Sequence, residues 1–192
     1  MKIKSIKESP LNYLKTFKIV YEDKTGRDKV WELTSRGDKA RLEKEIQGQE
    51  FSDGSMMVAW NETKTSLVMI KEFRIAAGHY VYSFPAGLQD EGEDILEASI
   101  REFKEETGMD FKPLGLDRPR YTSVGLTNEK VYTVFGRYSG NFSKEYLEDS
   151  EDISPLLVDR KKAIELLQNE DVTIRSAFIL RAFFQLPLYE EI

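Results

Sequence analysis

The segment from Gly87 to Met109 constrains the fold of this 192-residue chain more than any other part of the sequence. Within it, Asp94 is followed three residues later by Glu97, and this capping box predicts that a helix begins at Asp94 or Ile95. Gly108 is placed to end the helix, because glycine readily adopts the left-handed conformation found at helix C-termini. The sequence therefore predicts a single helix between these two signals.

The predicted helix has a mostly apolar stripe and an acidic edge. The stripe has helical spacing and consists of Leu96, Ile100, Phe103 and Thr107. On the acidic edge, Glu102 and Glu106 lie one turn apart, with Glu105 beside them and Arg101 within reach of Glu105. Like charges at this spacing destabilise an isolated helix, so the pattern favours bound cations that neutralise them. A solvated helix with many salt bridges is the ordinary alternative.

Four glutamates at fixed spacing indicate an oxygen-ligand site for a hard cation, and such cations most often serve phosphate chemistry. The chain reads G-x5-E-x7-R-E-U-x-E-E-x-G-U, where U is a bulky apolar residue, here Phe103 and Met109. With usage of roughly 5–7% for each fixed residue type, a chance match is on the order of one in a billion. This is the Nudix box with every fixed position intact, so the chain resembles the Nudix hydrolases.

The composition is that expected of a soluble cytoplasmic enzyme. The chain has no cysteine, which excludes disulfides, thiolate zinc sites and a cysteine nucleophile. No apolar run approaches the roughly 18–20 residues of a membrane span, and the N-terminus MKIKSIKESP lacks the apolar core of a signal peptide. The net charge of -6, without a basic stripe, argues against nucleic acid as a partner.

Segments with strand patterns precede the box, and both strands and helices follow it. An N-terminal hairpin is predicted from Leu14 to Tyr21 and Val30 to Leu33, and a second hairpin from Ser55 to Trp60 and Ser66 to Phe73. Residues 38–47 are predicted to form an exposed loop or a short helix. After the box, strands are predicted at residues 131–138 and 153–158, and helices at residues 159–167 and 171–185.

These elements predict an α/β fold of the Nudix type, in which a mixed β-sheet is sandwiched between helices in an α/β/α arrangement. An N-terminal antiparallel β-hairpin subdomain is attached to it. The length of 192 residues is that expected of a single domain. Within it we expect residues 1–50 to form the hairpin region for substrate binding and dimerisation, and residues 51–192 to form the Nudix hydrolase domain.

The segments before the box resemble the branch of the Nudix family that hydrolyses ADP-ribose and other ADP-sugars. Glu72-Phe73-Arg74 matches the x-[FY]-R strand end of this branch, and Phe84-Pro85-Ala86-Gly87-Leu88 matches its entry to the box. The resemblance implies that Arg74 contacts the diphosphate, since a planar guanidinium can bind two phosphate oxygens at once. Arg74 is followed by Ile-Ala-Ala-Gly instead of the proline-bearing segment of some members, which leaves the exact substrate open.

The N-terminal hairpin also resembles this branch. Trp31 and Tyr13 would stack on the two sides of the nucleobase and would come from different chains, because the hairpin of the family crosses to a partner subunit. The resemblance therefore implies a homodimer formed by hairpin exchange. Glu32 and Arg36 would flank the base and the substrate, and Glu129, near the post-box loop 125–128, aligns with a substrate-contacting position. Ordinary packing on the sheet is the alternative for both aromatic residues.

For the reaction, the resemblance implies a cation site at the box. Glu102 and Glu106 would be direct ligands together with the backbone carbonyl of Ala86, and Glu105 would be a ligand or a bridging partner. Two or three Mg2+ ions, with Mn2+ also possible, would bridge the diphosphate. Substitution at phosphorus would then give a nucleoside monophosphate and a sugar phosphate.

Further residues would complete the chemistry around the cations. Glu93 and Arg101 would hold the loop and helix of the box together. In this branch the general base comes from a late acidic loop, here Tyr146 to Asp152, in which Glu151 is the first choice and Glu148 the second. A plain acidic surface turn is the alternative for either carboxylate.

The preferred substrate is ADP-ribose or a close ADP-sugar, which would be hydrolysed to AMP and a sugar phosphate. Another nucleoside diphosphate derivative, such as GDP-mannose, NADH or coenzyme A, is the main alternative. A non-catalytic domain that senses nucleotides is a third reading. Such domains often lose carboxylates of the box, whereas this chain keeps all of them.

Overall fold

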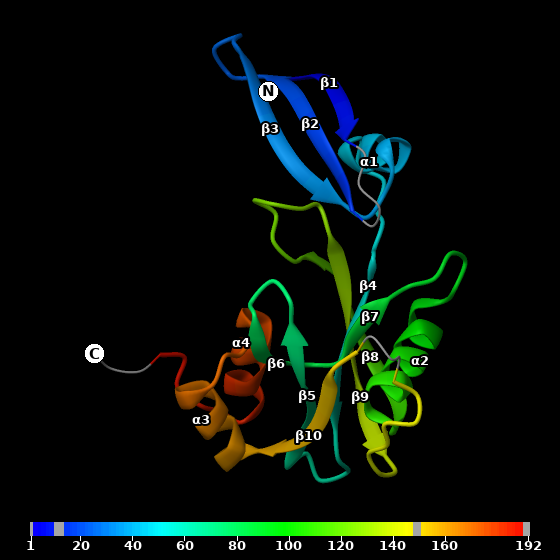
Figure 1. Cartoon of the computed structure of the whole chain (residues 1–192), viewed down its shortest axis with the longest axis vertical. Coiled ribbons are helices and arrows are strands. Elements are labelled where there is room, and N and C mark those ends of the chain that lie inside the picture. The colour runs from blue at the N-terminus through cyan, green and yellow to red at the C-terminus, as the bar shows by residue number, and fades with distance from the viewer. Residues whose placement is uncertain (1, 10–13, 148–150, 190–192) are drawn as a thin grey trace. The chain divides into compact units, whose positions relative to one another are not determined.

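The computed structural model describes residues 2–9, 14–147 and 151–189, and the chain divides into two compact units. Unit 1 consists of residues 1–53 and 118–132, and unit 2 of residues 54–117 and 133–192. Two strands, β8 (Asp110–Tyr121) and β9 (Lys130–Ser139), contribute residues to both units. Figure 1 follows the chain through its elements.

Unit 1 contains a three-stranded antiparallel sheet in the order β1 (Lys2–Ser9), β2 (Lys15–Glu22) and β3 (Asp28–Ser35). The predicted antiparallel hairpin is present as β2 and β3, and β1 adds a third strand that was not predicted. The pairing of β1 shifts register between Ile3 and Ser5. This irregularity interrupts the two-residue alternation by which a strand is recognised in a sequence.

One face of this sheet is covered by the helix α1 (Lys39–Ile46). Phe17 and Ile19 of β2 are buried together with Leu42 of α1, while Ile6 and Leu33 pack against them. Asp38 caps the helix by accepting a hydrogen bond of 2.8 Å from the Arg41 amide. Of the two forms predicted for residues 38–47, the short helix is therefore the one observed.

Unit 2 is built on a sheet whose main path is β10-β5-β4-β9-β8, with β6 paired to β5 and β7 paired to β4. The strands that begin and end in this unit are β4 (Gly54–Trp60), β5 (Ser66–Arg74), β6 (His79–Ser83), β7 (Ala86–Leu88) and β10 (Ile153–Asp159). Its helices are α2 (Ile95–Thr107), α3 (Arg160–Asn169) and α4 (Ile174–Phe183). None of these described helices is long and apolar enough to span a membrane.

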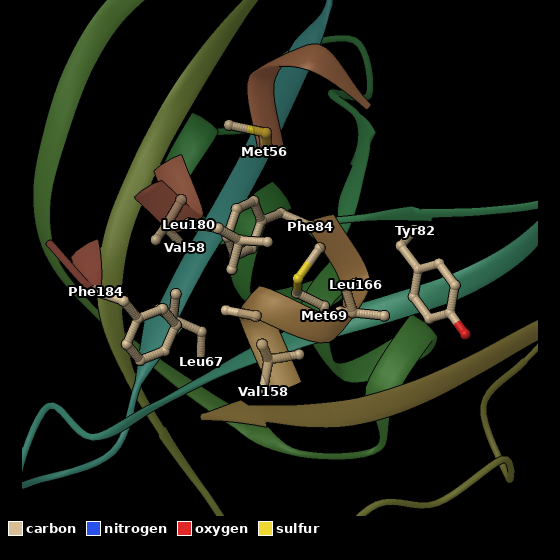
Figure 2. Packing of buried hydrophobic residues seen from close by; sticks show 11 residues of the cluster. Met56, Val58, Leu67, Met69, Tyr82, Phe84, Val158, Leu166, Leu180 and Phe184 are labelled. Carbon is tan, nitrogen blue, oxygen red and sulfur yellow. The ribbon is translucent and has the colours of Figure 1, made fainter. Parts of the chain in front are cut away.

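Helices cover both faces of strand β4. Met56 and Val58 point into a core that also contains Leu166 of α3 and Leu180 of α4 (Figure 2). Ser55 lies on the opposite face, where its Oγ is 2.8 Å from Ser99 Oγ of α2. Successive side chains of a strand point to opposite faces, so the continuous burial of β4 follows from helices on both sides. The predicted α/β arrangement is confirmed.

Most of the elements predicted around the box are present. The predicted strands correspond to β4, β5, β9 and β10, and the predicted helices after the box correspond to α3 and α4. Strand β8 was missed because it contains Pro113, Gly115 and Pro119, residues that argue against a central strand. Strand β8 lies at the end of the strand order, where a missing backbone donor is tolerated.

Candidate functional site

Helix α2 begins and ends where the sequence predicts. The Asp94 side chain accepts hydrogen bonds from the amides of Leu96 at 2.8 Å and Glu97 at 3.4 Å, and Gly108 adopts a left-handed conformation with φ of 74°. The predicted apolar stripe is only partly correct, because Leu96 and Ile100 are exposed. The face packed against β4 and β7 instead carries Ala98, Ser99, Phe103, Glu106 and Thr107.

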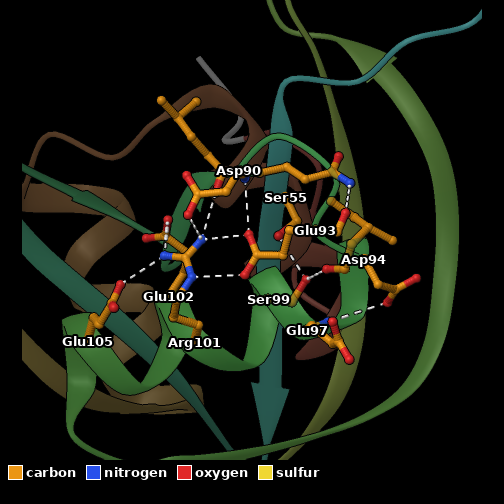
Figure 3. A network of polar contacts seen from close by, with 12 residues as sticks. Ser55, Asp90, Glu93, Asp94, Glu97, Ser99, Arg101, Glu102 and Glu105 are labelled. Carbon is orange, nitrogen blue, oxygen red and sulfur yellow. Dashed lines mark hydrogen bonds and ion pairs between the residues drawn. The ribbon is translucent and has the colours of Figure 1, made fainter.

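Arg101 lies at the centre of the acidic edge (Figure 3). Its guanidinium donates to both oxygens of Glu93 at 2.9 Å, to Glu102 Oε1 at 3.0 Å and to Glu105 Oε2 at 3.1 Å. It also donates to the carbonyl of Leu88 at 3.2 Å. The predicted contact between Arg101 and Glu105 is confirmed, and one guanidinium orients three carboxylates of the box.

The contacts between Arg101 and Glu93 shift the pKa of both residues. The hydrogen bond from Arg101, followed by that from the Asp90 amide, lowers the pKa of Glu93 below the usual carboxyl range. The same pairing with Glu93 raises the pKa of Arg101. Gln89 Nε2 donates to the Glu93 carbonyl at 2.6 Å, which closes the loop ahead of α2. Glu93 is therefore held as a carboxylate that fixes the loop to the helix.

Glu106 is the most deeply buried carboxylate of the box. Its Oε2 accepts a hydrogen bond of 3.0 Å from the Ala86 amide. Burial raises the pKa of Glu106 well above the usual carboxyl value, and the charges of Glu102, Glu72 and Glu151 raise it further, while the Ala86 amide opposes them. A buried carboxylate surrounded by other carboxylates is costly unless a cation compensates it.

Gly87 allows Glu102 to approach the strand before the helix. A Cβ atom at Gly87 would lie 1.9 Å from Glu102 Cδ and 2.0 Å from Glu102 Oε2, closer than side chains tolerate. The fixed glycine of the box therefore has a steric reason in this chain. Burial raises the pKa of Glu102, and hydrogen bonding to Arg101 partly offsets that rise.

Glu72 is a further carboxylate near this site that the sequence analysis did not assign. It lies in β5 opposite Ile153 of β10, and its Oε2 is 2.7 Å from Nη2 of Arg74. That contact lacks hydrogen-bond geometry, so this buried oxygen has an ion pair without a hydrogen bond among the described residues. Burial raises the pKa of Glu72, Arg74 lowers it and Glu151 raises it. Because alternate strand residues share a face, the spacing of Glu72 and Arg74 was a usable signal.

Within the proposed base loop, residues 146–147 and 151–152 are described, and Glu148 lies outside the described residues. Glu151 is exposed, and its charge raises the pKa of Glu72, Glu102 and Glu106, which places it in their electrostatic neighbourhood. The next residue, Asp152, is anchored twice. Its carbonyl accepts from the Phe73 amide at 3.1 Å, and its Oδ2 accepts from Tyr80 Oη at 2.6 Å.

The donor set of this site fits a hard cation. In the described part of the chain, no three acidic or histidine side chains are already placed to hold a metal ion together, and Arg101 engages Glu102 and Glu105. The four carboxylates Glu72, Glu102, Glu106 and Glu151 nevertheless act on one another, and Glu106 is buried with a single neutral hydrogen-bond donor. Oxygen donors with excess negative charge are those that Mg2+ or Mn2+ prefers.

The residues predicted to bind the nucleobase lie in unit 1 and are only partly brought together. Trp31 is opposite Ile19 in the sheet register and is 46% exposed, whereas Glu32 is opposite Lys18. Trp31 therefore points to the face covered by α1 and Glu32 to the other face. On that other face Glu32 lines a groove of about 700 Å3. The predicted partner aromatic, Tyr13, lies outside the described residues.

Two other predicted substrate residues form a pair. Arg36 Nε lies 2.7 Å from Glu129 Oε1, and Thr122 Oγ1 donates to Glu129 Oε2 at 2.8 Å. The two charged residues are 93 positions apart in the sequence, so their pairing could not be read from spacing. Glu129 thus holds Arg36 at the end of strand β3.

Comparisons with known proteins agree with this arrangement. The family model described as NUDIX domain matches residues 51–179, which is more than half of the chain. The ADP-sugar pyrophosphatase of Mus musculus is 32% identical over 134 residues, covering 67% of this chain and 57% of that protein. The GDP-mannose pyrophosphatase of Enterobacter sp. (strain 638) is 28% identical over 173 residues, covering 83% of this chain and 87% of that protein.

A solved structure shows the same fold. The crystal structure of an ADP compounds hydrolase matches with a TM-score of 0.72 and 19% sequence identity, covering 96% of this chain and 94% of that one. The chain spans 49% to 65% of the length of the ADP-ribose and ADP-sugar pyrophosphatases that it matches in Saccharomyces cerevisiae, Bacillus subtilis and Mus musculus.

Proposed function

Because the chain belongs to the Nudix hydrolase family, we propose that it hydrolyses the diphosphate bond of ADP-ribose or a related ADP-sugar to AMP and a sugar phosphate. The observation that carries this proposal is the complete set of box carboxylates, in which Arg101 orients three and Glu106 is buried beside Ala86. A domain that only senses nucleotides would not need a buried carboxylate that is costly without a cation. The similarity to ADP-ribose and ADP-sugar pyrophosphatases supports the choice of substrate.

The cofactor proposed is Mg2+, with Mn2+ as an alternative, in two or three ions. Glu102, Glu106 and the carbonyl of Ala86 would hold them, and Glu105 would be a ligand once it leaves Arg101. When bound, such ions would supply positive charge that neutralises the charge developing on the diphosphate in the transition state. Glu93 and Arg101 keep the loop and helix in register while the ligands rearrange.

The side chains of unit 2 supply the remaining steps. Glu151, with Glu148 as the second choice, accepts the proton of the water that attacks phosphorus. Arg74 binds the diphosphate oxygens, and Glu72, whose Oε2 lies 2.7 Å from Arg74 Nη2, orients the guanidinium. The phosphate that receives the water leaves with one product, and the bridging oxygen leaves with the other.

Recognition of the nucleobase is proposed for unit 1. Trp31 and Tyr13 would stack on the base, and Glu32, Arg36 and Glu129 would contact the base edge or the substrate. The opposite orientation of Trp31 and Glu32 supports a base site shared between two chains, because one strand does not present neighbouring side chains to one ligand. We therefore propose a homodimer built through residues 1–50, with residues 51–192 as the hydrolase domain, in the cytoplasm.

The test is a panel of substrates. The protein is incubated with Mg2+ and ADP-ribose, ADP-glucose, GDP-mannose, NADH or coenzyme A, and the monophosphate products are converted to phosphate by a phosphatase and quantified. We expect ADP-ribose or ADP-glucose to give the highest kcat/KM. GDP-mannose is the second candidate, because the match to a GDP-mannose pyrophosphatase covers 83% of the chain. A clear preference for GDP-mannose would overturn the proposed base site, and no turnover of any compound would overturn the hydrolase assignment.

A further inference from the structure

A partly buried ion-pair network in unit 1 centres on Arg41 of helix α1. Arg41 Nε donates to Glu45 Oε1 at 2.9 Å, and Arg41 Nη2 lies 2.7 Å from Asp53 Oδ1 and 3.3 Å from the carbonyl of Ser52. The guanidinium also stacks on Phe51, with its carbon 5.1 Å from the ring centre. Only an arginine can make these divergent contacts at once, because its planar fork carries several fixed donors.

The network reaches a loop distant in sequence, residues 122–130. Asp53 has a side chain that is 4% exposed, and its Oδ2 accepts from the Lys130 amide at 3.0 Å. The Asp53 amide donates in turn to the Lys130 carbonyl at 2.8 Å. Glu45 Oε2 accepts a hydrogen bond from the Asn128 side chain. We name Arg41, Glu45, Asp53 and Asn128 the loop clamp.

The other side of the same loop is fixed to strand β3. The Thr34 amide donates to the Leu126 carbonyl at 2.9 Å, and the loop is closed on itself by the Thr122 amide, which donates to the Glu129 carbonyl at 3.0 Å. Glu129, which lies between the two clamped positions 128 and 130, forms the 2.7 Å ion pair with Arg36. The clamp therefore fixes the backbone on both sides of the residue that orients Arg36.

The loop clamp fixes the position of residues 122–130 but adds little buried apolar surface. The loop leaves Val124 67% exposed and Leu126 71% exposed, so it adds little to the core of unit 1. Buried ion pairs are weak contributors to stability, because desolvation offsets their attraction, but they hold groups in one arrangement. A rigid loop with exposed side chains is the form that binding sites commonly take.

We infer that Arg41 and Asp53 are positioning residues, which fix residues 122–130 so that Glu129 holds Arg36 in the orientation used for the substrate. The inference rests on the proposed role of Arg36 in substrate binding. Helix α1, which lies outside the Nudix box, would thus strengthen ligand binding by fixing the loop that orients Arg36.

The experiment uses Arg41→Lys, which keeps the charge but loses the divergent donors, and Asn128→Ala, which removes one loop contact without touching the buried pair. Arg27→Ala is the matched control, since the Arg27 side chain is 72% exposed, lies in the same unit and contacts Asp23 and Thr25 within its own turn. Hydrogen exchange of the backbone amides in residues 122–130 is measured together with KM and kcat for ADP-ribose. We expect exchange at least about fivefold faster in this loop. We also expect KM to rise about five- to tenfold while kcat stays within about twofold. The control should change neither quantity.

Each result has a distinct meaning. Unchanged exchange in residues 122–130 in both clamp variants would show that the loop does not depend on the clamp and would overturn the inference. Faster exchange with an unchanged KM would also overturn it, because the clamp would then have only a structural role. If the unmodified protein hydrolyses no compound of the panel, the proposed function fails. The binding of AMP, measured by titration calorimetry in the same variants, then decides the inference, which requires weaker binding in both clamp variants.

Discussion

The carboxylate of Glu106 lies at a buried position where the fold disfavours its negative charge. Burial raises its pKa, and only the Ala86 amide among its described partners opposes that effect. A carboxyl group whose pKa is raised by folding stabilises the protein below its ordinary pKa, and that contribution is lost as the pH rises through the raised value. The residue therefore costs stability at neutral pH, as expected of a group retained for binding a cation.

We predict that Glu106→Gln loses activity and gains stability in the absence of cations. Turnover should fall by at least about a hundredfold, because a ligand of the cation site is lost. In EDTA at pH 8, the melting temperature should rise by about 2–5 °C relative to the unmodified protein. The gain should shrink at pH 5, where the unmodified residue is protonated more often. Glu97→Gln, at an exposed position of the same helix, is the control. Retained activity in Glu106→Gln would disprove the cation-site assignment.

Gly87 offers a second test of the same site from the steric side. The Gly87→Ala change places a methyl group where Glu102 Cδ lies, so Glu102 must move away from the strand. We expect weaker Mg2+ activation, with the concentration for half-maximal activity raised by about tenfold or more. Gly115→Ala is the control, because a Cβ atom at Gly115 meets nothing within 4 Å. Equal Mg2+ dependence in the two variants would show that the position of Glu102 does not matter.

The start of strand β10 is anchored beside the proposed base. The ladder between β5 and β10 begins with the pairing of Glu72 and Ile153, and Tyr80 of β6 holds Asp152 directly before it. Tyr80 Oη donates to Asp152 Oδ2, and this hydrogen bond raises the pKa of the Tyr80 hydroxyl. Strands β5 and β6 thus fix the point at which the acidic loop joins strand β10.

From this anchor we predict that Tyr80→Phe lowers kcat by about three- to tenfold with little change in KM, because the position of Glu151 becomes less fixed. Tyr138→Phe is a matched control, since the Tyr138 hydroxyl forms a similar bond of 2.7 Å with Ser66 Oγ on another part of the sheet. Steady-state kinetics with ADP-ribose measure both. An equal loss in the two variants would indicate a general loss of stability, and no loss in either would remove the positioning role of Tyr80.

The elements that the sequence predicted are those with local signals. Helix α2 was located correctly because Asp94 and Gly108 act within one turn of its ends. Its buried face was assigned less well, since the neighbouring strands select Ser99 and Glu106 over Leu96 and Ile100, and no local rule anticipates that choice. Strands β1 and β8 were missed because a register shift and two prolines obscure their alternation.

In the candidate site, too, the contacts that could be predicted are those between residues close in the sequence. The contact of Arg101 with Glu105 follows from helical spacing and was anticipated, whereas the pairing of Arg36 with Glu129 depends on the fold of unit 1. The opposite faces of Trp31 and Glu32 could have been read from their adjacency in a strand. The proposed base site made by two chains uses this opposite orientation of Trp31 and Glu32.

Assembly gives a prediction for the complete protein. A homodimer formed through residues 1–50 should have a mass about twice the 22.2 kDa of the chain when measured by light scattering after size-exclusion chromatography. The dimer should persist in EDTA, because the proposed interface does not involve the cation site. A mass equal to that of one chain would contradict the shared base site and would require Trp31 and Tyr13 to serve one ligand within a single chain.

The most direct test of the proposed activity is to follow the phosphorus NMR spectrum of ADP-ribose during incubation with the protein, first with Mg2+ and then with excess EDTA. We predict that the diphosphate signals are replaced by those of AMP and ribose phosphate with Mg2+, and that they remain unchanged with EDTA. Intact ADP-ribose in the presence of Mg2+, or equal hydrolysis in EDTA, would contradict the assignment of this chain as a cation-dependent ADP-ribose pyrophosphatase.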